Sequence, residues 1–346
     1  MHIGIIGAGA AASAAAYVLD STTDAELTVL EKSGGVCGRA ATRRRDGITY
    51  DYGANYLKDE DPRVNELVTE TLGTDGLHTI EEPIWVFDET GSVEPGRESD
   101  ERKWVYEQGM TQIAKRLFRQ TSVQVHRRTR VETVARRDGR WETQDPDGEW
   151  WGPFDLLLCN PPAPQTAELL RGADWASPAR KTLLNAVDAI AYRTVWTAIL
   201  GYPFEVDVPY YALVNPGKTH DVGWIAREEC KPGRVPEGSV LVVQANHDWS
   251  VSRYDDPPAK NVERLAAMTA EIIGDERLKS PAWTDHQGWR YALPDAEAAT
   301  GQFRAAESEG LYVLGDWVAG EARVHAALRN GLDVGERIAL QLTSER

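Results

Sequence analysis

The first 31 residues alternate between strand-like and helix-like patterns. Residues 3–6 are a short apolar run, residues 8–19 are rich in alanine, and residues 27–30 are a second apolar run that ends at Glu31. Short continuous apolar runs are typical of strands buried on both faces, and the stretch between them has the length of a helix. The pattern predicts a strand–helix–strand unit with a right-handed crossover.

The middle of the chain has a different pattern, in which short apolar segments alternate with turn residues. Residues 123–125 and 131–134 have strand patterns, and Asp-Gly pairs stand at 138–139 and 147–148. Asp-Gly favours tight hairpin turns because both central residues need positive φ. We predict a β-meander over residues 123–152, followed by a buried strand at 156–159.

The remaining elements are expected as strands at 194–200 and 240–244, a helix at 259–273, a buried strand at 311–314 and a last helix at 323–342. Residues 43–50 are polar and contain a turn. No apolar run reaches the length of about 18 residues that spans a membrane. The apolar N-terminus lacks a basic region, so we interpret it as mature sequence and not as a signal peptide.

A nucleotide-binding pattern lies in the first turn. Gly7-x-Gly9-x-x-Ala12 fits the dinucleotide fingerprint, in which the first Gly permits the tight turn and the second lets backbone N–H groups approach a pyrophosphate. Ala12 is small enough for close packing of helix and strand. Glu31 stands about 20 residues further on, where a carboxylate accepts hydrogen bonds from ribose hydroxyls.

Two further segments fit phosphate or polyol binding. Residues 34–42 are a glycine-rich stretch that contains Arg39, which would neutralise a phosphate; a surface loop with a solvated Arg is the alternative. Gly315-Asp316 stands between a predicted strand and the last helix. Asp316 would hold hydroxyls of a ribityl chain, and the helix end would face a polarised carbonyl.

Composition and charge exclude several classes of protein. The chain has 346 residues and a net charge of −16, so nucleic acid is not expected as a partner. It has only nine Lys against 29 Arg, which indicates either a cytosol of high salt or a GC-rich genome. Three scattered cysteines, Cys37, Cys159 and Cys230, predict neither disulfides nor a metal site and point to a reducing cytoplasm.

The motifs occur together in one order along nearly the whole chain. In this order the chain resembles the renalase-like branch of the flavin amine oxidase superfamily. The matching segments are Gly7-x-Gly9-x-x-Ala12, Glu31, Gly38-Arg39, Asp51-Tyr52-Gly53-Ala54-Asn55-Tyr56, Gly109-Met110, Trp289-Arg290-Tyr291-Ala292 and Gly315-Asp316-Trp317. The family usually has Gly where this chain has Cys37, so either a Cβ fits there or Cys37 takes a negative φ.

The resemblance implies an α/β fold with a discontinuous Rossmann-like FAD/NAD(P)-binding domain and an inserted α+β substrate domain built on a larger mixed sheet. The first would comprise residues 1–58, 101–165 and 301–346, and the second residues 59–100 and 166–300. FAD would be bound non-covalently. The cofactor-binding residues carried over are Gly7, Gly9, Ala10, Ala11, Ala12, Glu31, Lys32, Gly38, Arg39, Ala54, Asn55, Tyr56, Val131, Gly315, Asp316, Val324, His325 and Ala326.

The chemistry implied is hydride transfer from a small substrate to flavin N5, with O₂ reoxidising the flavin to give H₂O₂. Such a reaction needs no nucleophile or base from the protein, and no catalytic residue is assigned. The candidate pocket residues are Asn55, Tyr56, Trp289, Tyr291 and His325, with Tyr192 or Trp224 from the inserted sheet. Ordinary core packing is the alternative for each aromatic residue.

Several functions stay open at this stage. By resemblance, the leading hypothesis is oxidation of the 2- and 6-dihydro isomers of NAD(P). The runner-up is an amine oxidase or a carotenoid-type oxidase or desaturase on the same scaffold. From other classes, an NAD-dependent dehydrogenase and a non-catalytic flavin-binding protein also fit the fingerprint. The oligomeric state is not determined by any of these patterns.

Overall fold

A five-stranded parallel sheet forms the first half of the molecule. In the computed structural model, which describes residues 1–97, 100–296 and 298–344, the strand order is β10-β2-β1-β14-β20. The strands are β1 (His2–Ile6), β2 (Glu26–Glu31), β10 (Gln124–Arg127), β14 (Leu156–Cys159) and β20 (Leu311–Val313). The predicted strand–helix–strand unit is present, with α1 (Ala10–Thr22) between β1 and β2.

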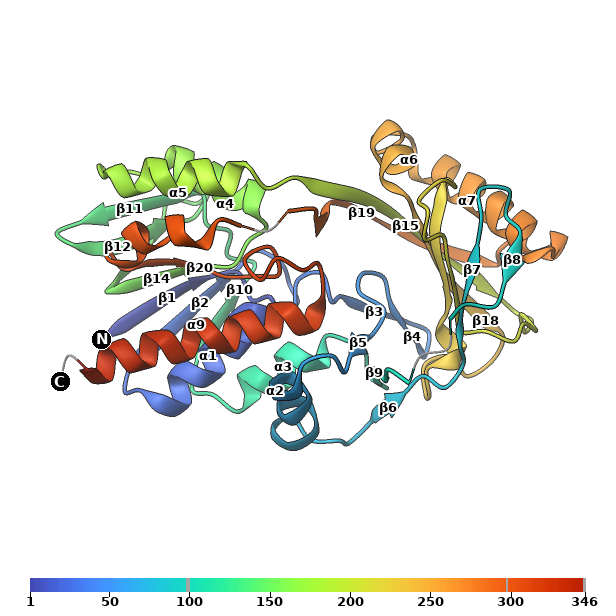
Figure 1. Cartoon of the computed structure of the whole chain (residues 1–346), viewed down its shortest axis with the longest axis horizontal. Helices are drawn as coiled ribbons and strands as arrows, with labels where there is room; N and C mark the ends of the chain where they lie inside the picture. The colour runs from blue at the N-terminus through green and yellow to red at the C-terminus, as the bar shows by residue number, and fades with distance from the viewer. Residues whose placement is uncertain (98–99, 297, 345–346) are drawn as a thin grey trace.

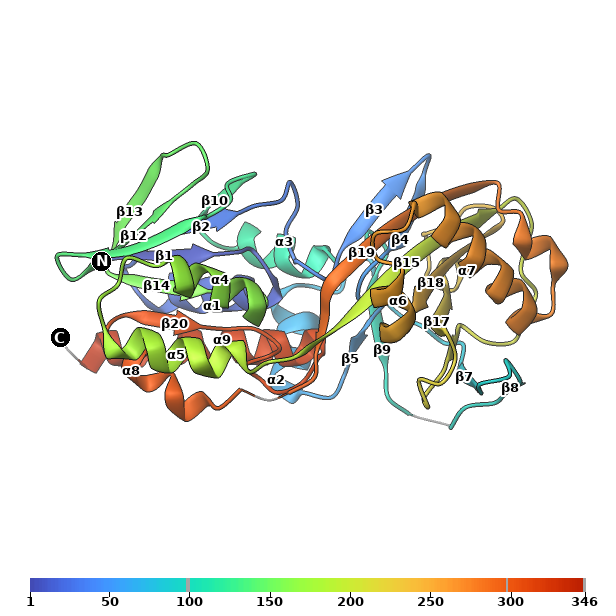
Figure 2. The ribbon, with the colours of Figure 1, turned by 90° about the horizontal axis from the view of Figure 1, so that it is seen from above.

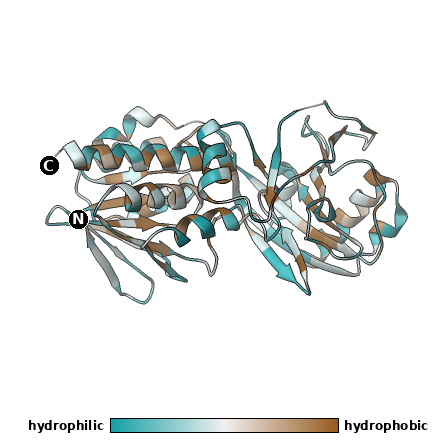
Figure 3. Ribbon diagram, turned by 90° about the horizontal axis from the view of Figure 1, so that it is seen from below, coloured by the Kyte–Doolittle hydropathy of each residue, from teal (hydrophilic) through white to brown (hydrophobic). Residues whose placement is uncertain are grey.

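Helix α1 packs closely against the last helix, α9 (Val324–Ser344), on one face of this sheet (Figure 1). The helices can approach because α1 is rich in alanine and α9 has glycines at the contact. A Cβ at Gly331 would collide with the backbone of Ala11, and one at Gly335 would lie 2.9 Å from Val18 Cβ. Hydrophobic and hydrophilic residues alternate along α9 (Figure 3), because only one of its sides is buried.

The predicted meander is confirmed for residues 133–152 and wrong for residues 123–125. Strands β11 (Thr133–Arg137), β12 (Arg140–Gln144) and β13 (Trp150–Phe154) form an antiparallel sheet. Asp138 and Gly139 both have positive φ, as the hairpin turn requires. Strand β10 instead pairs in parallel with β2, because its half-buried Val125 lies opposite the buried Val29.

Helices α4 (Ala163–Gly172), α5 (Pro178–Asp188) and α8 (Arg304–Glu307) also belong to this half. Their apolar residues share a core cluster with Trp141 and Trp317, beside the parallel sheet. Residues 166–188, which the sequence analysis assigns to the second domain, therefore pack on the first.

A seven-stranded mixed sheet forms the second half, as the resemblance implied (Figure 1). Its order is β19-β15-β18-β17-β16-β7-β8, and β16 and β7 are its parallel pair. The strands are β7 (Ile84–Phe87), β8 (Val93–Glu94), β15 (Tyr192–Tyr202), β16 (Ala212–Val214), β17 (Val222–Arg227), β18 (Ser239–Ala245) and β19 (Trp283–Pro294). Helices α6 (His247–Ser252) and α7 (Pro258–Ile273) cover one of its faces (Figure 2).

Short elements lie between the two halves. They are the hairpin β3 (Thr42–Arg45) and β4 (Ile48–Asp51), the small sheet of β5 (Leu57–Lys58), β9 (Lys103–Tyr106) and β6 (Leu77–Thr79), and helices α2 (Pro62–Glu66) and α3 (Gln112–Arg119). Single helical turns occur at Leu67–Thr71, Glu228–Cys230, Glu276–Lys279 and Thr300–Gln302. Within the described ranges no helix is both long and apolar enough to cross a membrane.

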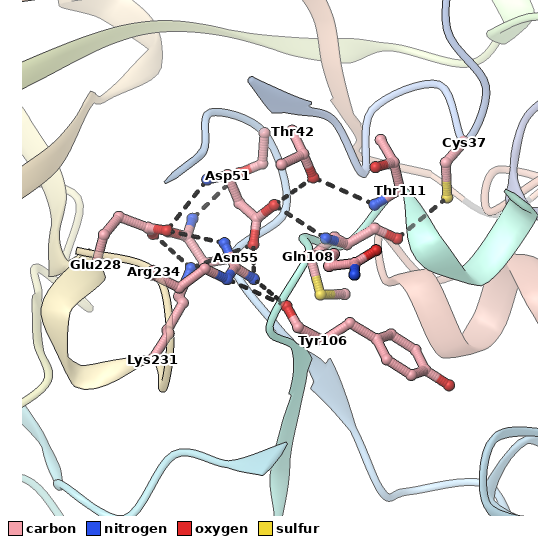
Figure 4. Close-up of polar contacts among 12 residues, drawn as sticks. Cys37, Thr42, Asp51, Asn55, Tyr106, Gln108, Thr111, Glu228, Lys231 and Arg234 are labelled. Carbon is pink, nitrogen blue, oxygen red and sulfur yellow. Dashed lines mark hydrogen bonds and ion pairs between the residues drawn. The ribbon is translucent and has the colours of Figure 1, made fainter. Parts of the chain in front are cut away.

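A buried network of four charges joins these short elements to the large sheet (Figure 4). Asp51 Oδ2 lies 2.8 Å from Arg234 Nη2 and 3.4 Å from Lys231 Nζ, and Glu228 lies 2.5 Å from Lys231 and 3.1 Å from Arg234. All four side chains are fully buried. Two positive and two negative charges therefore cancel inside the protein.

The network is also hydrogen-bonded to the backbone around it. Arg234 donates to Tyr106 O at 2.8 and 3.1 Å, and Asp51 Oδ1 accepts from Thr42 Oγ1 and from Met110 N–H. Burial opposes ionisation, but Arg234 and Lys231 hold the pKa of Asp51 below its usual value. This network fixes the segment that begins at Asp51 against the large sheet.

We predict that Arg234→Met destabilises the protein by about 3–5 kcal/mol, because it leaves two buried carboxylates with a single cation. The free energy of unfolding would be measured by urea denaturation. Arg63→Met is the matched control, since Arg63 pairs with Asp333 and Glu336 while its side chain is 44% exposed. An exposed pair contributes at most about 1 kcal/mol, and equal losses in both variants would contradict the prediction.

Candidate functional site

The loop from β1 into α1 leaves a helix end open. Gly7 has a φ of 90° and donates its N–H to Leu30 O at 2.8 Å, so the predicted tight turn is present. Gly9 precedes α1, and no side chain caps the helix. The first N–H groups of a helix have no partner within it, and the helix dipole is positive there. This end can hold an anion.

Glu31 lies at the carboxyl end of β2, beside this helix end. Its carboxylate accepts the N–H of Ala8 and the N–H of Ser33, each at 2.7 Å, and also the Ser33 hydroxyl. Glu31 is therefore a buried acceptor held in place by the loops on either side of it. The neighbouring Lys32 points elsewhere, because its amino group donates to Gln165 of α4.

The second glycine-rich loop lies against the first. Cys37 donates its N–H to Ala8 O at 2.7 Å, and a Cβ at Gly38 would lie 3.6 Å from Gly9 Cα. Cys37 keeps a positive φ of 78°, so of the two alternatives the first holds: the Cβ fits and the loop keeps the glycine-like conformation. Burial raises the pKa of its thiol to about 12.

Asn160 is a site residue that the sequence analysis missed. It follows β14 directly, accepts the N–H of Gly9 at 3.1 Å and donates to Leu314 O at 3.0 Å. A Cβ at Gly9 would collide with Asn160 Oδ1, so this contact is what requires glycine there. A polar amide directly after a buried strand, at the carboxyl edge of the parallel sheet, was the available signal.

Arg39 and Asp316 form one charged pair between the loops. Their side chains are 2.7 Å apart, and Arg39 also donates to Ala292 O at 2.9 Å. Asp316 is held in turn by the N–H of Trp317. Arg39 is thus neither a solvated surface residue nor committed to a single partner, because a guanidinium has five N–H donors.

The segment after Asp51 carries two of the candidate pocket residues. Asn55 donates to Gly53 O at 3.1 Å, and its buried Oδ1 has no hydrogen-bond partner in the described ranges of the chain. The Tyr56 ring packs against Tyr211, which directly precedes β16, and against Trp224 of β17, with centroids 6.4 and 6.2 Å away.

This three-ring group contains two more buried polar atoms without a hydrogen-bond partner among the described residues, the Tyr211 hydroxyl and the Trp224 indole N–H. Burial raises the pKa of Tyr211 well above its usual value. Tyr211 is not among the predicted site residues, because nothing in the sequence distinguishes it from the adjacent Tyr210.

Trp289 and Tyr291 belong to two other aromatic pairs. Trp289 stacks on Tyr52 with a centroid distance of 5.4 Å and donates to its backbone oxygen, and Tyr291 meets Tyr192 edge to face. In the part of the chain that the structure describes, no ring contact joins Tyr56 to either of them. Tyr192 also lies 5.9 Å from the Arg39 guanidinium.

His325 stands in the first turn of α9 and is 2% exposed. Its Nε2 faces two carboxylates, Glu60 at 3.2 Å and Glu321 at 3.3 Å, whereas no described residue forms a hydrogen bond with its buried Nδ1. Among the described residues, this is the one group whose His and acidic atoms lie close enough for a metal ion. A metal on Nε2 would leave an N–H on Nδ1 without an acceptor, so the geometry favours a proton on Nε2.

The other carried-over positions are mostly apolar. Val131 is buried in the same core cluster as Leu30, next to the end of β2. Ala54 donates its N–H to Arg39 O at 3.0 Å, which ties the pocket segment to the second glycine-rich loop. Val324 and Ala326 flank His325, and Gly315 donates its N–H to Asn330 of α9 at 2.8 Å.

Two sequence families match the chain. A NAD(P)-binding Rossmann-like domain matches residues 5–71, and the family described as flavin containing amine oxidoreductase matches residues 86–339. The first match contains both glycine-rich loops, and the second contains the large sheet, Arg234, Asp316 and His325.

Solved structures share the fold over nearly the whole chain. A protein from Exiguobacterium sp. 255-15 with the provisional name protoporphyrinogen oxidase has a TM-score of 0.80 at 15% identity, covering 98% of this chain and 99% of that one. Cyclohexylamine oxidase from Brevibacterium oxydans IH-35A has 0.76 at 13%, covering 100% and 99%. A reduced UDP-galactopyranose mutase has 0.78 at 12%, covering 99% and 94%. These similarities confirm the expected fold class.

We predict that the three thiols are unreactive in the folded protein. Burial raises the pKa of Cys37 and Cys159 to about 12 and that of Cys230 to about 11, all above the ordinary 9.0. At pH 8 the thiolate fraction of Cys37 should be lower by on the order of 10³, and thiolate is the reactive form. A thiol-specific chromogenic reagent should count three thiols in denaturant and react slowly without it; one fast native thiol would contradict the prediction.

Proposed function

This chain belongs to the family of flavin-containing amine oxidoreductases, and we propose that it oxidises the 2- and 6-dihydro isomers of NAD(P) with O₂ as electron acceptor. Its membership of the flavin amine oxidase superfamily makes it an FAD-dependent oxidoreductase. The substrate, the electron acceptor and the residue roles that follow are our proposal.

The residues at the carboxyl edge of the parallel sheet fit FAD. The uncapped end of α1, with Ala10, Ala11 and Ala12 in its first turn, would hold the pyrophosphate together with Arg39. The buried Glu31 carboxylate would accept ribose hydroxyls, with the Ser33 hydroxyl giving way. Buried polar groups are normally hydrogen-bonded. Four buried polar atoms that lack a partner in the part of the chain the structure describes, those of Asn55, Tyr211, Trp224 and His325, are therefore further support.

Further contacts are assigned by position. Val131 would lie beside the adenine, Asp316 would bind the ribityl chain, and His325, with Val324 and Ala326, would face the flavin pyrimidine. Glu60 and Glu321 favour a proton on Nε2 of His325, so its Nδ1 would carry no proton and would act as a hydrogen-bond acceptor toward the flavin. Gly38, Ala54 and Tyr56 would line the path between the phosphates and the pocket.

Bound FAD supplies the hydride acceptor, and the chain has to bind and orient the donor. The observation that carries our substrate proposal is the group of Tyr56, Tyr211 and Trp224. Its rings can pack on a planar dihydropyridine, and the unpartnered hydroxyl and indole N–H can bind a carboxamide. Orienting the donor carbon in this way supplies much of the rate enhancement in such a reaction.

An amine oxidase on the same scaffold is the second candidate. It is favoured by the family itself and by the fold shared with cyclohexylamine oxidase. A primary amine lacks the planar carboxamide, so it would leave the Tyr211 and Trp224 polar atoms unpaired. The two candidates therefore differ in whether those atoms matter for turnover.

We predict that Arg39→Ala weakens FAD binding by about 1.5–3 kcal/mol, the range for a hydrogen bond to a charged group. This corresponds to about a 10- to 150-fold higher Kd, measured by quenching of FAD fluorescence. Arg43→Ala is the control, because it removes the same charge from a residue that pairs with Asp285 instead. Unchanged flavin affinity in Arg39→Ala would remove Arg39 from the site.

We predict that isomeric dihydronicotinamides bleach the bound flavin in anaerobic stopped-flow measurements, and that a panel of amines does not. Tyr211→Phe should slow the bleaching about tenfold through one lost hydrogen bond, with flavin content unchanged. Tyr210→Phe is the matched control, since its ring packs against Trp85 and not against Tyr56.

Bleaching by amines alone, with Tyr211→Phe as fast as the parent protein, would replace our proposal with the amine oxidase. A purified protein without bound or reconstitutable yellow chromophore would refute both.

A further inference from the structure

The basic residues of this acidic chain are unevenly distributed. Between Gln108 and Val131 there are six Lys and Arg residues and no Asp or Glu, in a chain whose net charge is −16. The segment comprises α3, strand β10 and the loop that follows it. The rest of the chain is therefore even more acidic than the net charge of the whole chain indicates. A positive field near this segment has to come from its own side chains.

This segment borders the nucleotide-binding end of the parallel sheet. Strand β10 is an edge strand next to β2 (Figure 2), and Arg127 stands opposite Glu31 in the register. The backbone beyond it is tied to the second glycine-rich loop: Arg128 donates its N–H to Ser33 O at 3.1 Å, and Thr129 donates to Glu31 O at 2.9 Å. A Cβ at Gly34 would lie 3.7 Å from Arg128 Nε.

We define the basic rim as five cations. Four belong to this segment, Lys115, Arg119, Arg127 and Arg128, and the fifth is Arg44 of β3, whose guanidinium donates to Gln108 O. None of the five has a carboxylate within 4.0 Å in the described part of the chain, although Arg39, Arg43 and Arg45 do.

Four of them are exposed, and Lys115 is half-buried. Burial, followed by the positive charges of Arg44, Arg119 and Arg127, lowers the pKa of Lys115, so the cations lie close enough to repel one another. Their mutual repulsion is a cost that an approaching anion would relieve.

We propose that the basic rim recruits the phosphates of FAD, drawing the dinucleotide toward Glu31 and the end of α1 and so speeding its association. The proposal rests on the proposed FAD site. Without such a rim, the net charge would repel a dianionic cofactor from the whole surface. Charges placed around a binding site raise association rates by about 10- to 1000-fold, and salt suppresses the effect. A nucleic acid would meet repulsion from the acidic remainder of the surface, whereas a dinucleotide is small enough to meet the rim alone.

The test measures FAD association with the full-length chain after its flavin has been removed, with circular dichroism to check the fold. Stopped-flow quenching of FAD fluorescence gives the association rate at low and high salt. The rim variant is Lys115→Gln/Arg119→Gln/Arg127→Gln. The control is Lys181→Gln/Lys218→Gln/Lys260→Gln, which removes the same charge. These three exposed lysines lie on other elements and form no ion pair with any described residue.

The rim variant should bind FAD about tenfold more slowly at roughly 0.01 M salt, with an unchanged dissociation rate, and the difference should vanish at about 0.5 M. The control should change the rate less than about twofold, and riboflavin, which lacks phosphate, should bind all three proteins equally fast. Equal slowing in both variants, or a rim variant with the parental salt dependence, would overturn the proposal. Absence of FAD binding in the parent protein would instead refute the FAD site.

Discussion

The buried charge network around Asp51 is the contact on which the arrangement of the candidate site depends. It contains one acid from the β3–β4 hairpin and three charges from the turn after β17, so it joins the elements next to the parallel sheet to the large sheet. Asp51 begins the segment that carries Asn55 and Tyr56, and Lys231 lies 5.9 Å from the Tyr211 ring. The network therefore holds the β3–β4 hairpin against the large sheet within a few residues of the proposed substrate group of Tyr56, Tyr211 and Trp224.

A buried network is a demanding way to join two sheets. Each ion loses several kcal/mol of hydration, and only paired charges with further hydrogen bonds recover it. An apolar contact of the same size would be as stable but would tolerate sliding, because hydrophobic contact is not directional. Fixed donor and acceptor geometry at Asp51 and Arg234 instead specifies one position of the β3–β4 hairpin relative to the turn after β17, next to the proposed substrate group.

Local patterns were sufficient to predict much of the fold. The alternation of apolar runs with an alanine-rich helix predicted β1, α1 and β2, and the Asp-Gly pair at 138–139 predicted the first hairpin of the meander. Strand β10 was assigned to the wrong sheet because a short apolar run has no signal for its partner. The Asp51 network could not be predicted, since Asp51 stands about 180 positions from Lys231 and Arg234, and any Lys or Glu resembles a surface residue until the chain is folded.

The net charge likewise follows from the composition, whereas the positions of the individual cations follow only from the fold. The net charge of −16 describes the chain as a whole. A ligand, however, responds to the electrostatic potential within about 10 Å of its path at 0.1 M salt. Beside Glu31, the proposed rim cations Arg127 and Arg128 have no carboxylate within 4.0 Å in the described part of the chain, whereas Arg39, deeper in the site, is balanced by Asp316. The cations are thus unpaired where an anion would approach and paired where it would be held. The unpaired cations of the basic rim would accelerate association of the ligand. The paired Arg39 guanidinium instead stabilises the site before the ligand binds, so the rim has a kinetic role and Arg39 a structural one.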